Sequence, residues 1–196
     1  MKTAHSQIND LSIIDSDNLT RFESIEELKK CLLHIEQILD ASILLYKNNF
    51  FEQSVFLVIT TLEEISKAEV CAFRYPNNTD RVKRSKDGLF NHHIKHSIAA
   101  NEVTFNFLKI KEKYGVKKIQ AIFEKLKNGS FINIRENSLY FRCNKGKLKT
   151  SDDFISQENN KILLELCIEI FEDRLFGYSD QTDFITDRVL QKLELI

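Results

Sequence analysis

The chain has 196 residues, of which 42% are hydrophobic and 29% are charged, a mixture typical of a globular protein and not of a disordered or fibrous one. This length favours one domain over residues 1–196, with a core that needs no disulfide or metal for its stability. With only 5 Gly and 1 Pro, the chain lacks the turn residues that a β-sandwich or barrel requires, so helices are the first expectation.

The polar residues 1–19 lack a regular hydrophobic period, so we expect a loose N-terminal arm. A first helix is predicted over 21–46, where Ser24 and Glu27 have the spacing of a capping box, and a start at Thr20 fits equally well. A second helix is predicted over 50–73, ending before Pro76. Both predicted helices carry apolar residues at three- and four-residue steps. The short connection between them predicts an antiparallel pair.

A basic, polar loop is expected over 76–87, followed by helices over 88–113 and 116–127 that Gly115 separates. Residues 130–150 have a different pattern, which predicts a small hairpin or an extended segment. Two more helices are predicted over 157–176 and 183–195. The expected fold class is all-α: an antiparallel helical bundle with a small hairpin insertion near 130–150.

The first ten residues contain no apolar segment of the kind found in signal peptides. The longest apolar stretch, over 55–62, is far too short to cross a bilayer. The four cysteines (Cys31, Cys71, Cys143 and Cys167) are widely spaced and form no paired motif. We therefore expect a cytoplasmic protein with free thiols and no membrane partner.

Charge is unevenly distributed along the chain. Residues 81–149 contain 17 Lys and Arg but 5 Asp and Glu, whereas the remainder contains 11 and 24. A basic middle segment is typical of a surface that binds phosphates or an acidic partner. Neutralisation of one part by the other, within the fold or across a dimer, explains the pattern equally well. The predicted nucleic-acid-binding residues are those of the basic loop: Arg81, Lys83, Arg84 and Lys86.

Three groups of residues have the composition of a functional site. In the second predicted helix, the four-residue spacing of Glu63 and Lys67 predicts an ion pair on the helix surface. Glu64 is expected nearer to the apolar stripe, where a carboxylate can act as an acid or base or orient one.

The second group consists of His92, His93, Lys95 and His96 in the third predicted helix. Histidine is the usual general acid or base near neutral pH, although a surface or capping role is commoner for any single histidine. His92 and His96 share a helix face, as in some metal sites, but no motif supplies a third ligand. No metal is therefore expected, and with no glycine-rich phosphate loop in the sequence, no cofactor is expected either.

The third group contains Arg135 and Tyr140. An arginine can bind a phosphate through two hydrogen bonds, and a tyrosine can stack on a nucleic-acid base. Equally, Arg135 could pair with an acidic helix while Tyr140 packs in the interior.

The order and spacing of these elements resemble the AbiV family of abortive-infection proteins, a branch of the HEPN superfamily. The matching elements are the leading helix pair, the Glu-Glu-Ile-Ser-Lys segment at 63–67, the His-x-x-Lys segment at 92–95 and the Arg-x-x-Ser-Leu-Tyr segment at 135–140. The family usually has Gly at the position of Ser66. The resemblance covers roughly residues 38–176.

This resemblance implies a HEPN-like helical bundle, usually dimeric, that stops phage multiplication at the cost of the infected bacterial cell. Many HEPN proteins are metal-independent ribonucleases marked by an Arg that is followed four to six residues later by His. In this sequence, the residue at that distance after Arg135 is Tyr140 and not a histidine. For a ribonuclease of this kind we expect Arg135 to bind the phosphate, His92 or His93 to be the base or acid, and Glu64 and Lys67 to orient them. Lys95 and Tyr140 complete the predicted catalytic set.

Three functions stay open at this point. The first is a defence effector that degrades RNA or arrests translation. The second, favoured by the missing Arg-to-His hallmark, is a non-catalytic helical homodimer that binds a phage or host protein, including a phage-encoded trigger. The third, a metal enzyme, depends only on the spacing of His92 and His96.

Overall fold

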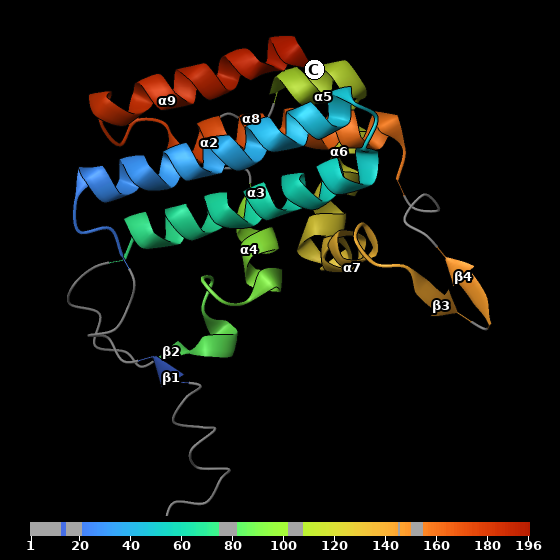
Figure 1. Ribbon diagram of the computed structural model, residues 1–196. Coiled ribbons are helices and arrows are strands. Elements are labelled where there is room, and N and C mark those ends of the chain that lie inside the picture. Colours follow the sequence, from blue (N-terminus) through green and yellow to red (C-terminus); the bar gives the residue numbers. More distant parts are fainter. Residues whose placement is uncertain (1–12, 15–20, 75–81, 102–107, 145, 150–154) are drawn as a thin grey trace, which may run out of the picture.

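Four long helices surround one apolar core in the computed structural model (Figure 1). The structure describes residues 13–14, 21–74, 82–101, 108–144, 146–149 and 155–196. The helices are α2 (Ile25–Lys47), α3 (Phe51–Ala72), α8 (Gln157–Leu175) and α9 (Asp180–Gln191), which a 3-10 turn, η4 (Lys192–Leu195), extends. Helix α3 is antiparallel to α2, and α9 is antiparallel to α8 (Figure 1). The predicted antiparallel bundle is confirmed.

The ends of the first two helices follow from local sequence. Ser24 is the N-cap of α2, and its side chain accepts a hydrogen bond from the Glu27 backbone N–H, as the capping box predicts. Asn49, between the two helices, has a positive φ of 64°, a conformation that Asn tolerates better than most residues. The chain therefore reverses within a few residues and places α3 against α2.

Helix α3 is the central element, because α2, α8 and two shorter helices all contact it. Buried polar bonds fix its start: the Ser42 and Ser54 hydroxyls each donate to the other residue's carbonyl at 2.9 Å, and the Asn160 amide donates to the Phe51 carbonyl at 3.0 Å. These bonds join α2, α3 and α8 at one end of the bundle. Because helices pack on several of its sides, α3 is buried over more of its circumference than a single apolar stripe would provide.

A second layer covers the side of α3 that α2 and α8 leave open. It consists of α4 (His92–Ala99), α5 (Leu108–Tyr114), α6 (Val116–Lys127) and α7 (Ser130–Asn137). The predicted helix over 116–127 is confirmed. The single helix predicted over 88–113 is wrong, because α4 ends at Ala99 and α5 begins at Leu108. Residues 102–107 lie outside the described parts of the chain. No Gly or Pro marks the end of α4, so composition alone gave no sign of this break.

The segment 130–150 is helical first and extended later. Gly129 has a positive φ of 77°, which favours glycine, and α7 starts directly after it. Strands β3 (Arg142–Asn144) and β4 (Lys147–Lys149) then pair antiparallel. The predicted hairpin is confirmed at 142–149, whereas residues 130–137 form a helix because Phe131 and Ile134 pack on the core at helical spacing. The hairpin projects away from the bundle (Figure 1).

The remaining sequence predictions have mixed outcomes. The predicted loose arm over 1–19 lies outside the described residues, except for β1 (Ile13–Ile14), which pairs with β2 (Val82–Lys83). Beyond β2, residues 84–86 form the 3-10 turn η2 (Arg84–Lys86). All four cysteines carry free thiols, as expected. In the described parts of the chain, each helix is too short or too polar to span a membrane.

Candidate functional site

A buried carboxylate, Glu63 in α3, is the centre of a cluster of basic side chains. Glu63 is only 3% exposed. Its oxygens lie 2.8 Å from His92 Nδ1, 3.0 Å from His96 Nε2 and 2.9 Å from Arg135 Nη1. Lys95 Nζ lies 3.8 Å from Oε2. One carboxylate thus meets four basic groups that come from α4 and α7. We call these five residues the Glu63 cluster.

Helix α4 supplies three of the four basic groups because the residue at which it starts decides which side chains face α3. The Asn91 side chain caps the helix by accepting a hydrogen bond from the Ile94 N–H at 3.2 Å. From this start, His92, Lys95 and His96 fall at three- and four-residue steps and therefore share one face. That face meets α3, where the Ser66 hydroxyl, 2.8 Å from the Lys95 carbonyl, hydrogen bonds to it. A small side chain at this position lets the two helices approach closely.

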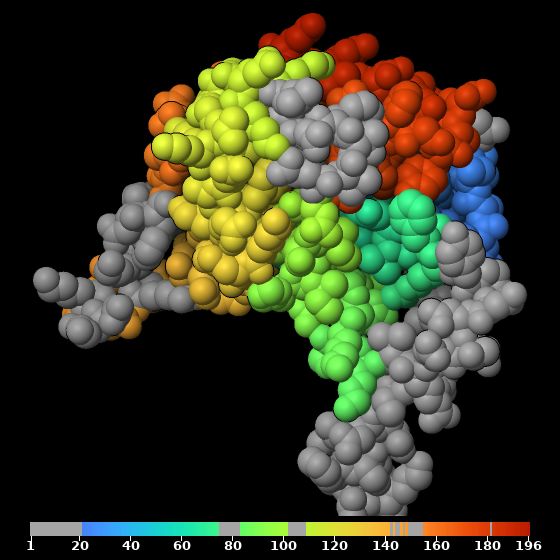
Figure 2. All heavy atoms as spheres, turned by 180° about the vertical axis from the view of Figure 1, so that it is seen from behind, coloured from blue at the N-terminus to red at the C-terminus, as the bar shows by residue number. Residues whose placement is uncertain are grey.

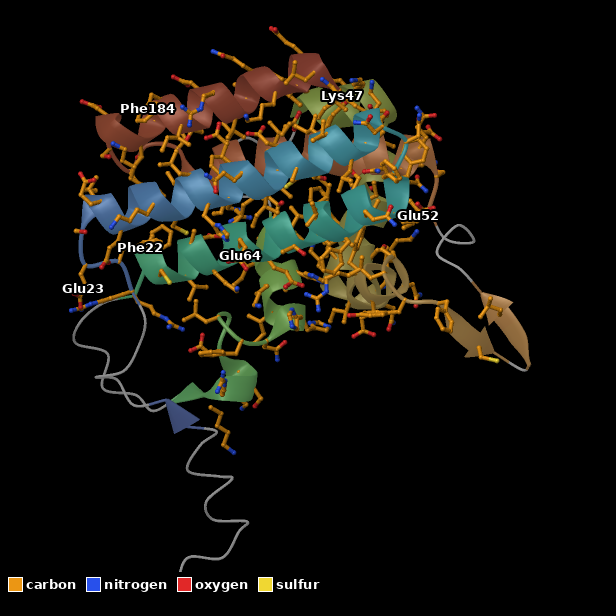
Figure 3. All side chains as sticks on the ribbon, viewed as in Figure 1. Phe22, Glu23, Lys47, Glu52, Glu64 and Phe184 are labelled. Carbon is orange, nitrogen blue, oxygen red and sulfur yellow. The ribbon has the colours of Figure 1, made fainter. Side chains whose placement is uncertain are left out.

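Arg135 reaches the cluster from the last turn of α7. Its Nη1 is 2.9 Å from both Glu63 oxygens and 3.3 Å from His92 Nδ1. Figure 3 shows nitrogen-bearing side chains in the space between α4 and α7, and in the space-filling view the surfaces of these two helices adjoin (Figure 2). The guanidinium side chain is 18% exposed, so Arg135 lies at the edge of the cluster.

The histidine rings have different environments. His96 is fully buried, and its Nδ1 has no hydrogen-bond partner among the described residues. This arrangement fits a neutral ring that donates from Nε2 to Glu63. The His92 side chain is 41% exposed. When His92 Nδ1–H donates to Glu63, the other ring nitrogen, Nε2, carries a lone pair that can accept a proton.

The charges of the cluster do not cancel. Burial alone would raise the pKa of Glu63, but the hydrogen bond from His96 and the nearby charges of Arg135, His92 and Lys95 outweigh it and lower the pKa. Burial lowers the pKa of Lys95, and the charge of Glu63 opposes this. Glu63 carries one negative charge against the positive charges of Lys95 and Arg135, so the cluster has a net positive charge. It therefore favours a bound anion.

The structure reverses the predicted arrangement of the two adjacent glutamates. Lys67 pairs with Glu64 and not with Glu63, so the predicted surface ion pair of Glu63 is wrong. The Glu64 and Lys67 side chains are 23% and 32% exposed, and neither touches the histidines in any described contact. Figure 3 labels Glu64 on α3. The sequence pattern did not predict Glu63 or His96 as members of a catalytic site. Ser66, small and one turn after Glu63, is the signal that could have identified the buried face.

The other predicted site residues lie outside the cluster. His93 is exposed and lies against Gly129, where an added Cβ would come within 3.0 Å of its ring. Tyr140 is 66% exposed, next to the hairpin. Lys83, Arg84 and Lys86 are exposed on β2 and η2, and the Arg84 guanidinium lies 4.1 Å from the Phe90 ring centroid. Arg81 lies outside the described residues. The structure therefore brings together His92, Lys95 and Arg135 from the predicted set.

The histidine pair does not form a metal centre in the described structure. His92 and His96 both face the same carboxylate, and the described residues contain no group of three or more His, Cys, Asp or Glu placed to hold a metal ion. The arrangement instead suits proton transfer beside an anion, because a fixed and partly exposed imidazole lies next to a guanidinium and an ammonium group.

Comparison with known proteins identifies the family. The family model described as AbiV, of the HEPN group, matches residues 23–172. No curated protein and no solved structure gives a significant match. The matched region runs from the start of α2 into the last turns of α8 and contains every residue of the Glu63 cluster. The family model covers well over half of the chain, so this protein belongs to the AbiV family of the HEPN superfamily.

Proposed function

We propose that this protein stops RNA metabolism and translation in phage-infected bacterial cells by cleaving RNA at the Glu63 cluster without a metal. Its membership of the AbiV family supports a role in abortive-infection defence. One observation carries the catalytic part of the proposal. His92 is held through Nδ1 by a buried carboxylate, while 41% of its side chain stays exposed. A carboxylate that fixes the tautomer of a histidine is a recurrent feature of general bases.

In the proposed reaction, His92 Nε2 takes the proton of a ribose 2′-hydroxyl. The 2′-oxygen then attacks the adjacent phosphorus, the bond from phosphorus to the 5′-oxygen breaks, and the 5′-oxygen takes a proton from water. The hydroxide that this leaves takes the proton held by His92, which restores the neutral imidazole. Arg135 and Lys95 stabilise the negative charge on the phosphoryl oxygens. Glu63 holds His92 and Arg135 in position and stabilises the imidazolium that forms. Glu63 thus takes the orienting role that the sequence analysis assigned to Glu64 and Lys67.

Recognition of RNA extends beyond the cluster in this proposal. Lys83, Arg84 and Lys86 are exposed just before α4, the helix that carries His92. Exposed lysines and arginines contact phosphates and make the affinity depend on salt. Removing three phosphate contacts from a single strand reduces the slope of log affinity against log salt by about 2. RNA titrations of the wild type and the Lys83→Ala/Arg84→Ala/Lys86→Ala variant over a salt series test this step.

Cleavage of single-stranded RNA by the purified protein, in the presence of a metal chelator, tests the catalytic step. His92→Ala should reduce the cleavage rate by roughly 10²–10⁴-fold, the usual contribution of a general base. His93→Ala is the matched control, because the neighbouring His93 is exposed and lies outside the cluster. Equal cleavage by His92→Ala and His93→Ala would contradict the proposal, as would a lack of RNA cleavage both in vitro and in infected cells.

A second candidate function is supported by the hairpin. Beside and on this projecting element, large apolar side chains are exposed: Tyr140 by 66%, Phe141 by 74% and Leu148 by 66%. Exposed apolar residues gathered at one place are typical of a protein interface. In this alternative the protein is a non-catalytic homodimer that acts by binding a phage or host protein.

A Tyr140→Ser/Phe141→Ser variant separates the two candidates. If binding is the function, this variant should lose phage protection, while His92→Ala should retain it. If RNA cleavage is the function, purified Tyr140→Ser/Phe141→Ser should cleave RNA at the wild-type rate. Measuring phage protection and RNA cleavage for Tyr140→Ser/Phe141→Ser and for His92→Ala decides between the two functions.

A further inference from the structure

An arginine and an aromatic ring are stacked on the surface just before α4. The Arg84 guanidinium carbon lies over the Phe90 ring, 4.1 Å from its centroid. Both residues are exposed, Phe90 by 39%. Figure 1 shows β2 and the turn after it outside the helical bundle, next to α4. We call Arg84 and Phe90 the stacked pair.

The contact covers only one side of the guanidinium. This group is planar, and a plane stacked on a ring has a second face pointing away from that ring. Among the described residues, the Arg84 side chain has no contact of hydrogen-bond or ion-pair type, and Phe90 is its one charged-group partner of any kind. The second face of an exposed arginine held in this way can accept another flat group.

Hydrogen bonds within the turn hold the stacked pair in place. The Asp87 N–H donates to the Arg84 carbonyl at 3.2 Å, and the Phe90 N–H donates to the Asp87 carbonyl at 3.0 Å. The Asn91 side-chain amide donates to the Ser85 carbonyl at 2.5 Å. Because Asn91 is also the N-cap of α4, these bonds fix the pair relative to the start of that helix.

The charge around the stacked pair is positive. Lys83 and Lys86 are exposed beside Arg84, whereas the carboxylate of the turn, Asp87, is buried and bound by Arg74. Exposed cations bind phosphates whatever the base, and a guanidinium plane is a surface on which an unpaired base stacks. Cations beside such a plane match a single strand, because the bases of a duplex are already stacked on one another.

The stacked pair also lies close to the proposed general base. Phe90 and His92 are two residues apart, so at most about 7 Å separates their Cα atoms. A base held by the pair therefore belongs to a nucleotide near the phosphate that the Glu63 cluster would bind.

We propose that the stacked pair binds one unpaired base of single-stranded RNA, on the face of Arg84 opposite Phe90. This inference rests on the proposed action on RNA and names the form of RNA that the site takes. Phe90 keeps the guanidinium plane in position, and the N–H groups at the edge of that plane remain available to a phosphate. A duplex, in contrast, binds through its phosphates alone.

Fluorescence anisotropy of the full chain with two short labelled strands tests the proposal. One strand is 2′-O-methyl RNA, and the other has the same length and phosphates but only abasic units. Neither has the 2′-hydroxyl that the proposed cleavage needs, so binding is measured apart from catalysis. We expect the strand with bases to bind roughly 5- to 150-fold more tightly, the contribution of one stacked base.

Equal affinity for the two strands would overturn the proposal. Absence of binding to both would overturn it as well and would leave this basic surface to an acidic protein. A preference for the strand with bases, in a protein that cleaves no RNA, would support the stacked pair while the catalytic proposal fails.

Variants link the preference to the stacked pair. Arg84→Lys keeps the charge and removes the plane, so the strand with bases should lose roughly fivefold or more in affinity, while the affinities for the abasic strand and for duplex RNA stay unchanged. Phe90→Leu should have the same effect. Phe73→Leu, the matched control, changes another exposed phenylalanine, at the end of α3, and should bind as the wild type does.

A charge control separates stacking from phosphate binding. Lys86→Ala should weaken the binding of both strands by the same factor, because a lysine contacts phosphates and not bases. An unchanged preference for the strand with bases in folded Arg84→Lys, with the fold checked by circular dichroism, would contradict the assignment to the stacked pair.

Discussion

Glu63 is the residue on which the basic groups of α4 and α7 converge. At 3% exposure it holds Arg135, His92 and His96 by hydrogen bonds at 2.8–3.0 Å. Its neighbour Glu64 makes an ion pair with Lys67 at the surface. Surface ion pairs contribute little to stability, whereas removing one member of a buried pair leaves an uncompensated charge. Two adjacent glutamates therefore have different energetic roles.

Substitution of the two glutamates tests this difference at the residue scale. Glu63→Gln should lower the free energy of unfolding by about 3–5 kcal/mol, because Lys95 and Arg135 lose their counter-charge. Glu64→Gln, the matched control, should change it by less than about 1 kcal/mol. Urea denaturation of both variants measures these values. Similar losses in the two variants would contradict the central place of Glu63.

A half-buried carboxyl on α8, that of Glu169, predicts a pH dependence of the stability. Burial raises the pKa of Glu169 from 4.5 to about 7. A raised pKa in the folded state gives stability that is complete below pH 4.5 and is lost as the pH rises through 7. Glu169→Gln, which stays neutral, should therefore gain stability relative to the wild type over this range. The control is Glu158→Gln, at an exposed position.

Thermal or urea unfolding of the wild type and both variants between pH 4 and pH 8 measures this effect. A stability difference between the wild type and Glu169→Gln that stays constant from pH 4.5 to 7 would show that Glu169 does not titrate in this way.

At the scale of elements, the contact between α3 and α4 determines the geometry of the Glu63 cluster. Ser66 is fully buried at this contact and hydrogen bonds to the Leu62 and Lys95 carbonyls. The hydroxyl thus ties α4 to α3 beside Lys95, within one turn of His92. Any side chain larger than Ser at this position would push α4 away from α3.

Substitutions at Ser66 test this contact. Ser66→Ala removes the hydrogen bond and should cost about 1 kcal/mol of unfolding free energy, with RNA cleavage retained. Ser66→Leu overfills the contact and should cost about 1–3 kcal/mol. It should also lower RNA cleavage strongly, because His92 moves away from Glu63. Full cleavage by folded Ser66→Leu would show that the cluster tolerates displacement of α4.

The sequence predicted the helices more accurately than it predicted the members of the Glu63 cluster. The predicted helices over 21–46, 50–73 and 116–127 agree closely with α2, α3 and α6, because their apolar periodicity and their ends are local properties. The break after α4 has no such signal. The choice between Glu63 and Glu64 depends on which flank of α3 is covered, and only the packing of α4 and α7 decides that. His92, Lys95 and Arg135 were predicted from the chemistry of their local groups together with the family resemblance, whereas His96 was named as a partner of His92 in a metal site but not in the catalytic set.

At the scale of the whole molecule, some residues of the basic middle segment are paired with acidic residues and others are exposed. Part of the basic middle segment is neutralised within the fold, because Lys113 pairs with Glu165 and Lys118 with Glu158, both on α8. Lys83, Arg84 and Lys86 remain exposed near the start of α4. Neutralisation within the fold therefore explains one part of the segment, whereas the other part stays exposed. The exposed part supports the proposed binding of RNA.

Phage challenge of bacterial cells that carry the wild type, His92→Ala or Glu64→Gln tests the central claim most directly, with total RNA and protein synthesis followed through infection. His92 is 41% exposed, so its replacement should leave the fold intact, which circular dichroism of the purified variant checks. We predict that the wild type and Glu64→Gln protect the culture and lose RNA, while His92→Ala does neither. Protection and RNA loss with His92→Ala equal to those of the wild type would contradict a catalytic role for the Glu63 cluster.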